Sequence, residues 1–220
     1  MSQNEVKVFD ELPAAITGEP RDLLSCVGNS EALPGISSVV ANPRFKPVRD
    51  LASLDEFLGE YIGQILVPIE LPAVLSAWQF TEHSQVRELI ELDADLSRDE
   101  ALGQFRAASC AVGRRQLSKL RPLRDHRVIQ RYWQAMEEGR AAAWHTLVYG
   151  ILTSTYSLPL RQSLTHLSQQ TLGGFALSAT VDHQFRLDDC RRILCGHCDG
   201  LGSSINSLVE STGPALVIAR

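Results

Sequence analysis

The residues best suited to chemistry lie together near the end of the chain, in the tetrapeptide Cys195-Gly196-His197-Cys198. Two cysteines separated by two residues are typical of a dithiol redox motif. That chemistry needs the first cysteine at a helix N-terminus that follows a strand, because the helix dipole stabilises its thiolate. The residues before Cys195 continue a helical pattern instead, so the motif lacks this context. A CxxC redox protein remains one alternative.

Zinc binding is the second chemistry that these residue types allow. The candidate ligands are Cys190, Cys195, His197, Cys198 and His183. On an unbroken helix, at about 100° per residue, Cys190 and His197 share a face while Cys195 lies about 140° away. A tetrahedral site would need a helix break near Gly196 or ligands from a second chain. We therefore predict no metal and no cofactor, and we keep Cys195, His197 and Cys198 as the metal-ligand candidates.

Other catalytic motifs are missing from the sequence. It contains no G-x-x-x-x-G-K-[ST] phosphate loop, no H-E-x-x-H and no G-x-S-x-G. Four further histidines are scattered singly, namely His83, His126, His145 and His166. We predict no catalytic residues and a protein that is not an enzyme.

The composition is that of one globular domain. The 220 residues are 44% hydrophobic, and the net charge of -5 comes from intermixed acidic and basic side chains with no basic stripe for nucleic acid. No window approaches the ~20 uninterrupted apolar residues of a membrane helix, and the first 20 residues begin with polar and acidic side chains where a signal peptide would be cationic and then apolar. The five cysteines are too few for a disulfide scaffold. These features predict a cytoplasmic protein that binds neither nucleic acid nor a membrane.

Helical periodicity begins after a segment rich in proline and glycine. We predict an irregular segment over residues 1–50, an all-helical domain over residues 51–212 and a tail over residues 213–220. Capping boxes at Ser53 with Glu56 and at Ser97 with Glu100, and caps at Ser84, Asp125 and Asp188, mark expected helix starts. Pro68 is expected to end one helix, Pro72 and Pro159 to begin others, and Gly139 to follow another.

No strand pair with a turn between is visible, and no repeat of 20 to 50 residues matches a solenoid consensus. The predicted fold is therefore all-α, a single closed bundle of roughly seven to nine helices. Trp78, Trp133 and Trp144 fall on apolar faces and are expected in the core.

The helix predicted near residues 102–117 has a set of small residues. Ala107, Ala108, Ala111 and Gly113 would let another backbone approach closely, which predicts tight internal packing. Its arginines are expected in solvent or against a partner. Asp93 and Asp95, in the preceding predicted helix, are expected to be surface charges.

The segment from residue 71 to 120 resembles the middle of the UreF family of urease accessory proteins. The resemblance rests on an L-P segment at Leu71, an L-D dipeptide at Leu92 and Asp93 in the next helix, and a following long helix. The family's pattern in that helix is E-x-R-x-x-S-x-x-x-G-R-x-L, and this chain offers Arg106, Ser109, Gly113, Arg114 and Leu117 in the same order. Near the start, residues 29–35 echo the family's D-S-x-L-P-x-G segment. The family's G-L-E and P-L-G-Q elements have no counterpart here.

Membership would imply a non-enzymatic scaffold. Family members are homodimers that bind the UreD (also called UreH) accessory protein and recruit the GTPase UreG, so that nickel reaches apo-urease. The resemblance points to Leu33, Pro34, Arg106 and Arg114 as partner-binding candidates. A diverged helical adaptor with another partner is the alternative from a different class.

Overall fold

The computed structural model describes residues 48–103, 105–120, 126–182 and 184–211, and every regular element in them is helical. This confirms the all-α prediction. The expected irregular segment, the cap at Asp125, the C-terminal tail, and the candidates Leu33 and Pro34 lie largely or wholly outside the described residues.

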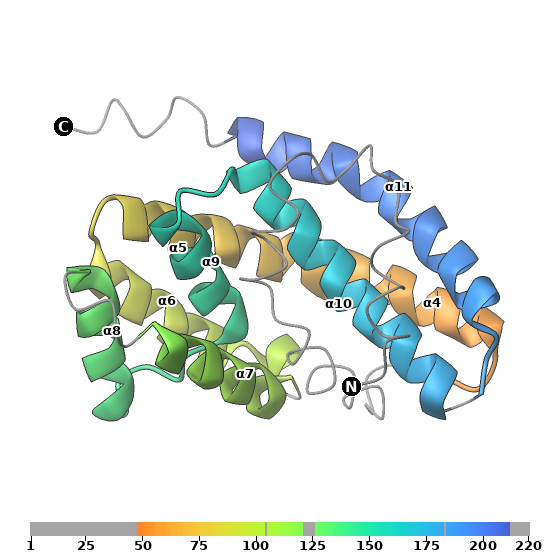
Figure 1. Cartoon of the computed structure of the whole chain (residues 1–220), viewed down its shortest axis with the longest axis horizontal. Coiled ribbons are helices and arrows are strands. Elements are labelled where there is room, and N and C mark those ends of the chain that lie inside the picture. The colour runs from red at the N-terminus through yellow and green to blue at the C-terminus, as the bar shows by residue number, and fades with distance from the viewer. Residues whose placement is uncertain (1–47, 104, 121–125, 183, 212–220) are drawn as a thin grey trace.

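The elements follow one another with short connections (Figure 1). In chain order they are α4 (Leu51–Tyr61), the π-helix η3 (Ile62–Glu70), α5 (Leu71–Glu82), α6 (Val86–Arg98), the 3₁₀ turn η4 (Glu100–Leu102), α7 (Arg106–Lys119), α8 (Arg127–Glu137), α9 (His145–Thr155), α10 (Leu160–Asp182) and α11 (Leu187–Ser211). The pairs α5 with α9 and α10 with α11 make the most extensive contacts, and α4 lies against both α10 and α11.

Pro68 does not end a helix, contrary to the prediction. The chain passes from α4 through η3 into α5 without a break, and the N–H of Leu71 donates to the carbonyl of Leu66, five residues back. The wider π-turn accommodates a residue that lacks an N–H and would clash in an α-turn. Pro72 lies near the start of α5, as expected.

The continuous stretch Leu51–Glu82 is long and apolar enough to cross a membrane by length and composition alone. In this fold it carries core residues, and 44% of its most apolar window is buried. A core helix of a soluble protein passes the same test, so this observation is weak support for a membrane segment.

Several predicted caps lie one to three residues away from the real ones. Asp50 caps α4, and Ser53 is its reciprocal partner at the third position, rather than the cap itself. Ser84 adopts φ 58° in the turn before α6. Ser97 lies inside α6, and Asp99 caps η4 instead. Asp188 is in the first turn of α11.

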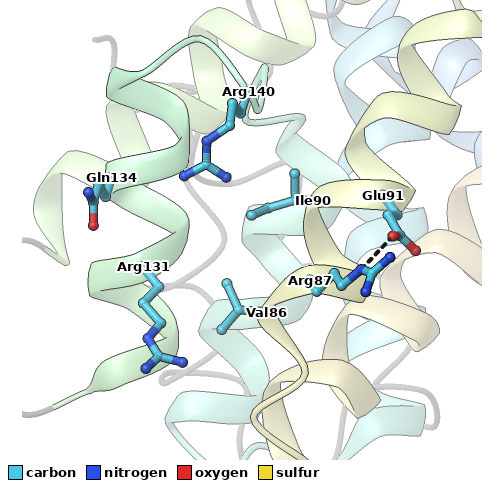
Figure 2. A pocket seen from close by; sticks show the side chains of 7 residues that line it. All are labelled: Val86, Arg87, Ile90, Glu91, Arg131, Gln134 and Arg140. Atoms are coloured by element: carbon cyan, nitrogen blue, oxygen red, sulfur yellow. Dashed lines mark hydrogen bonds and ion pairs between the residues drawn. The ribbon is translucent and has the colours of Figure 1, made fainter.

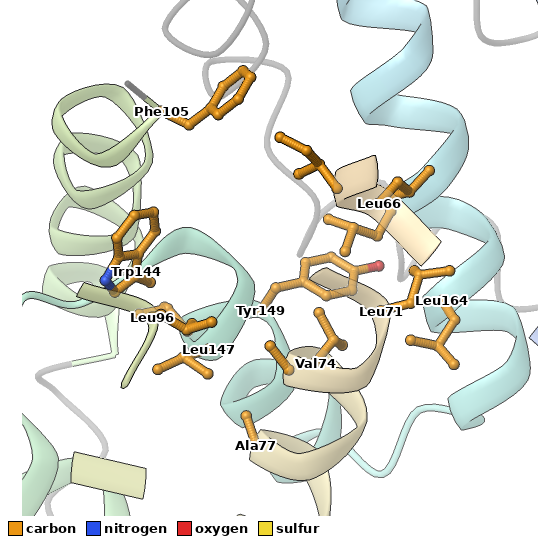
Figure 3. Close-up of a cluster of buried hydrophobic side chains, with 14 of the residues drawn as sticks. Leu66, Leu71, Val74, Ala77, Leu96, Phe105, Trp144, Leu147, Tyr149 and Leu164 are labelled. Carbon is orange, nitrogen blue, oxygen red and sulfur yellow. The ribbon is translucent and has the colours of Figure 1, made fainter. Parts of the chain in front are cut away.

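The core consists of aliphatic and aromatic side chains, and Figure 3 shows the part in which η3, α5, α6, α9 and α10 meet. Helix α9 comes very close to α5 at Gly150, where an added Cβ would lie 2.6 Å from the carbonyl oxygen of Val74. Only glycine therefore allows α9 to pack so closely on α5. Trp144 is in this core as predicted, whereas Trp78 and Trp133 are only partly buried.

Candidate functional site

The connector, which we define as residues 138–144 between α8 and α9, is held by Asp93 of α6. The carboxyl group of Asp93 accepts hydrogen bonds from the backbone N–H of Ala142 (2.6 Å) and of Ala143 (3.0 Å). It also accepts one from the hydroxyl of Tyr132 on α8 at 2.6 Å. One side chain thus joins α6, α8 and the connector.

Asp93 is only 1% exposed, so its expected role as a surface charge is wrong, whereas Asp95 is exposed and pairs with Arg98. Asp93 continues the apolar face formed by Leu89 and Leu96, four residues before it and three after it. That spacing is the signal that could have placed it inside. No local pattern indicates that Tyr132 is its partner, because 39 residues separate the two.

Helix α7 holds the other side of the connector. Arg114 donates from Nε to the carbonyl oxygen of Ala142 (3.2 Å), and the hydroxyl of Ser109 accepts from the N–H of His145 (3.1 Å). Gly113 touches the connector directly, since an added Cβ would lie 2.0 Å from the carbonyl oxygen of Ala143. We call Asp93, Tyr132, Ser109, Gly113 and Arg114 the connector clamp.

The close approach predicted for α7 is therefore real at Gly113 but absent along the rest of the small-residue set. Ala107 and Ala111 are exposed, and Ala108 is half-buried. The neighbour that needs the space is the end of the connector and the first residue of α9, not a second helix face.

Burial next to the connector clamp shifts several pKa values. Burial, and secondarily the charge of Asp93, raises the pKa of Cys110 to about 11. Burial lowers the pKa of His145 to about 4, so the ring is neutral at pH 7. Its Nδ1 is hydrogen-bonded to the side-chain amide of Gln116, with 2.8 Å between Nδ1 and Oε1. These groups are held in inert states rather than poised for proton transfer.

A groove of about 380 Å³ opens between α6, α8 and the connector (Figure 2). Its lining residues are Val86, Arg87, Ile90, Glu91, Arg131, Gln134 and Arg140. Arg87 pairs with Glu91 at 2.9 Å, and Arg140 pairs with Glu138 of the connector. Among the described residues, Arg131 has no ion pair or hydrogen-bond partner.

A second buried polar pair lies far along the chain from the connector clamp, where the Tyr61 hydroxyl donates to Oε2 of Glu70 at 2.7 Å. Desolvation raises the pKa of Glu70 to about 7, although the hydrogen bond from Tyr61 acts in the opposite direction. Glu70 is the last residue of η3 and is half-buried, so the end of the π-helix places an ionisable group beside the buried ring of Tyr61.

The Cys195–Cys198 tetrapeptide lies within the unbroken helix α11. Cys190 and Cys198 are buried, and burial raises the pKa of Cys198 to about 12. His197 instead bridges to α4, with Nε2 2.8 Å from Oδ1 of Asp55. Within the described ranges, no three His, Cys, Asp or Glu side chains gather as metal ligands would. His197 is thus bonded to Asp55 of α4, while Cys195 is half-buried on the same helix.

The predicted partner-binding residues have different environments. Arg106 is exposed at the start of α7. Arg114 is also exposed, but its guanidinium group is bonded to the connector, so it has a structural contact that the sequence did not indicate.

Comparison with known proteins identifies one family. The family model named UreF matches residues 48–180, more than half of the chain. This range contains the whole connector clamp and the groove, but not α11. A search among curated proteins found no match.

Proposed function

This chain belongs to the UreF family of urease accessory proteins, and on that premise we propose that it is a non-enzymatic scaffold for nickel insertion. It would bridge a UreD/UreH-like protein and a UreG-like GTPase next to apo-urease. Its mechanism would be positional, through protein surfaces rather than through a catalytic centre.

The proposal rests on what the residues that resemble the UreF pattern do in this fold. Asp93, Ser109, Gly113 and Arg114 all bind or contact one connector and the first residue of α9. Chemistry would require such groups to face a substrate, whereas here they fix the relative positions of α6, α7, α8 and α9. A rigid arrangement of helices is what a scaffold needs, because preorganised surfaces lose less entropy on binding.

The remaining features of the proposal concern assembly. We propose a cytoplasmic homodimer in which residues 51–212 form the helical domain, with residues 1–50 and 213–220 as flanking segments. Leu33, Pro34, Arg106 and Arg114 remain the candidates for partner contacts.

Co-expression with the accessory proteins of the same genome tests the bridging role. The tagged chain should retain a UreD-like protein directly, and a UreG-like GTPase only when the UreD-like protein is present. Urease activity should require the chain in a reconstituted operon. Failure to bind either folded partner would refute the bridging role and favour the diverged adaptor.

A further inference from the structure

We propose that the groove between α6 and α8 is a docking site for an acidic segment of a protein partner, with Arg131 as its central contact. The inference deepens the proposed scaffold function and rests on it for the partner's identity, but not for the chemistry of the groove.

The charge of the groove is the first argument. Three arginines and one glutamate line it, in a chain whose net charge is -5. Arg131 is exposed and, within the described part of the chain, has no internal partner. A guanidinium group binds a carboxylate through two parallel hydrogen bonds, so an acidic side chain would satisfy a cation that the fold leaves unpaired.

The other two arginines are available as well. The pair of Arg87 with Glu91 is highly exposed, with side-chain exposures of 86% and 60%. Arg140 and Glu138 are also exposed. Exposed ion pairs contribute little stability, so a partner carboxylate can displace or share them at small cost. The rim can thus contact two or three acidic side chains.

The floor of the groove is apolar. Val86 and Ile90 stand one helical turn apart on α6 and are each half-buried, between the arginines of the two walls (Figure 2). An apolar floor inside a polar rim is the usual anatomy of a protein interface, and arginine is enriched at such contacts. The matching occupant is a short segment in which an apolar side chain lies between acidic ones.

The connector clamp holds the walls of the groove in place. Tyr132, next to Arg131, is bonded to Asp93 behind the groove. Gly139, at φ 74°, turns the chain so that the N–H of Arg140 returns to the carbonyl of Ala135 (2.8 Å). Arg131 and Arg140 are therefore presented from fixed backbone positions, which lowers the entropy cost of binding.

A nucleic acid fits the groove less well than an acidic peptide. Affinity for nucleic acid grows with the number of phosphates that are neutralised, and the groove offers at most three arginines on a chain of net charge -5. Phosphates would also leave the apolar floor uncovered.

The test uses a fluorescent peptide, Glu-Glu-Leu-Leu-Glu-Glu, and the full-length chain in an anisotropy titration at low salt. Arg131→Glu should weaken binding at least tenfold. The matched control, Arg161→Glu, changes the same charge at an exposed site on α10 and should weaken binding less than twofold. Unfolding midpoints of both variants should equal that of the parent chain.

Several results would overturn the proposal. They are no peptide binding at millimolar concentration, equal losses in the two variants, unchanged affinity when both leucines of the peptide become alanine, or tighter Arg131-dependent binding of an oligothymidylate of equal charge.

Binding of the parent chain and of Arg131→Glu to the accessory proteins distinguishes a failure of this proposal from a failure of the bridging role. If the parent chain binds its partners and Arg131→Glu binds them equally well, the groove is not a docking site in that complex, and the bridging role stands. If the parent chain binds no partner, the bridging role fails, and the peptide titration still decides the chemistry of the groove.

Discussion

At the scale of single residues, position 113 must be glycine because the backbone of the connector lies against it. We expect Gly113→Ala to destabilise the protein by about 1–3 kcal/mol through overpacking on the carbonyl of Ala143, despite a gain of about 1 kcal/mol in helix propensity. Gly200 of α11 is the control, because an added Cβ there meets nothing within 4 Å. Gly200→Ala should raise the unfolding midpoint, and a raised midpoint in Gly113→Ala would contradict the close contact.

Asp93 is the residue on which the connector depends most. Asp93→Asn replaces one acceptor oxygen with a donor that faces donors, and should cost on the order of 3 kcal/mol in chemical unfolding. Tyr132→Phe should cost about 1 kcal/mol. Asp95→Asn, exposed on the same helix, should stay within about 0.5 kcal/mol of the parent. Equal effects at positions 93 and 95 would show that the buried carboxyl group is not needed.

Two buried groups should give opposite pH dependences of stability. The pKa of Glu70 rises from 4.5 to about 7, so its contribution to stability is lost as pH rises through this range. The pKa of His145 falls from 6.5 to about 4, so its contribution is lost as pH falls between these values. Each is worth about 3 kcal/mol at most, and the two largely cancel between pH 4.5 and 6.5.

Variants that lack one of the two groups should show the pH dependence of stability that the other group causes. In Glu70→Gln, stability should rise with pH from 4 to 6.5, because only the histidine remains. In His145→Asn, stability should fall as pH rises from 4.5 to 7. Urea unfolding at a series of pH values measures both, and parallel curves for the parent and the two variants would be inconsistent with these shifts.

At the scale of elements, α9 takes its N-terminal cap from another helix. Trp144 supplies no side-chain cap, and the hydroxyl of Ser109 on α7 accepts the first N–H of α9 instead. Ser109→Ala should therefore cost about 1 kcal/mol and speed amide hydrogen exchange at His145. Ser118→Ala, exposed near the end of α7, should change neither. Unchanged exchange at His145 in Ser109→Ala would disprove the cap.

At the scale of the whole molecule, the core extends beyond the range that the family model matches. Helix α11 follows residue 180 and buries Cys190, Leu194, Cys198, Leu201 and Ile205. A chain ending at Arg186 would expose the faces of α4 and α10 that α11 covers. We expect it to be insoluble or to unfold at a much lower temperature than the full chain. A cooperative unfolding transition at the parental midpoint would show that α11 is dispensable.

Self-association is also decided at this scale. A homodimer interface of scaffold type should bury well over about 1,000 Å² and persist at micromolar concentration. Size-exclusion chromatography with light scattering should thus report twice the chain mass of 24.3 kDa. A monomer at these concentrations would remove the dimer from the proposal.

The sequence alone determined the fold class and most of the helices. Residues close together in the chain are enough for this: apolar spacing marks the buried faces, Gly139 marks the end of α8, and Pro159 precedes α10. The same periodicity placed the C-G-H-C tetrapeptide inside a helix, which α11 confirms; the absence of a metal site there stays a prediction. The family resemblance was also visible in the order of a few residues from Leu92 to Leu117.

Only the tertiary structure decided what those residues do. Asp93 looked like a surface charge because its partners, Tyr132 and the connector, are 39 to 50 residues away. The predicted helix caps are wrong by one to three residues because several Ser and Asp side chains near each helix start could cap it, and tertiary packing decides which residue begins the helix. Pro68 predicts a helix end because proline disrupts an α-helix, and no local pattern indicates the π-helix that accommodates it here. The groove at Arg131 combines two helices that no local pattern connects, so it exists only once the chain has folded.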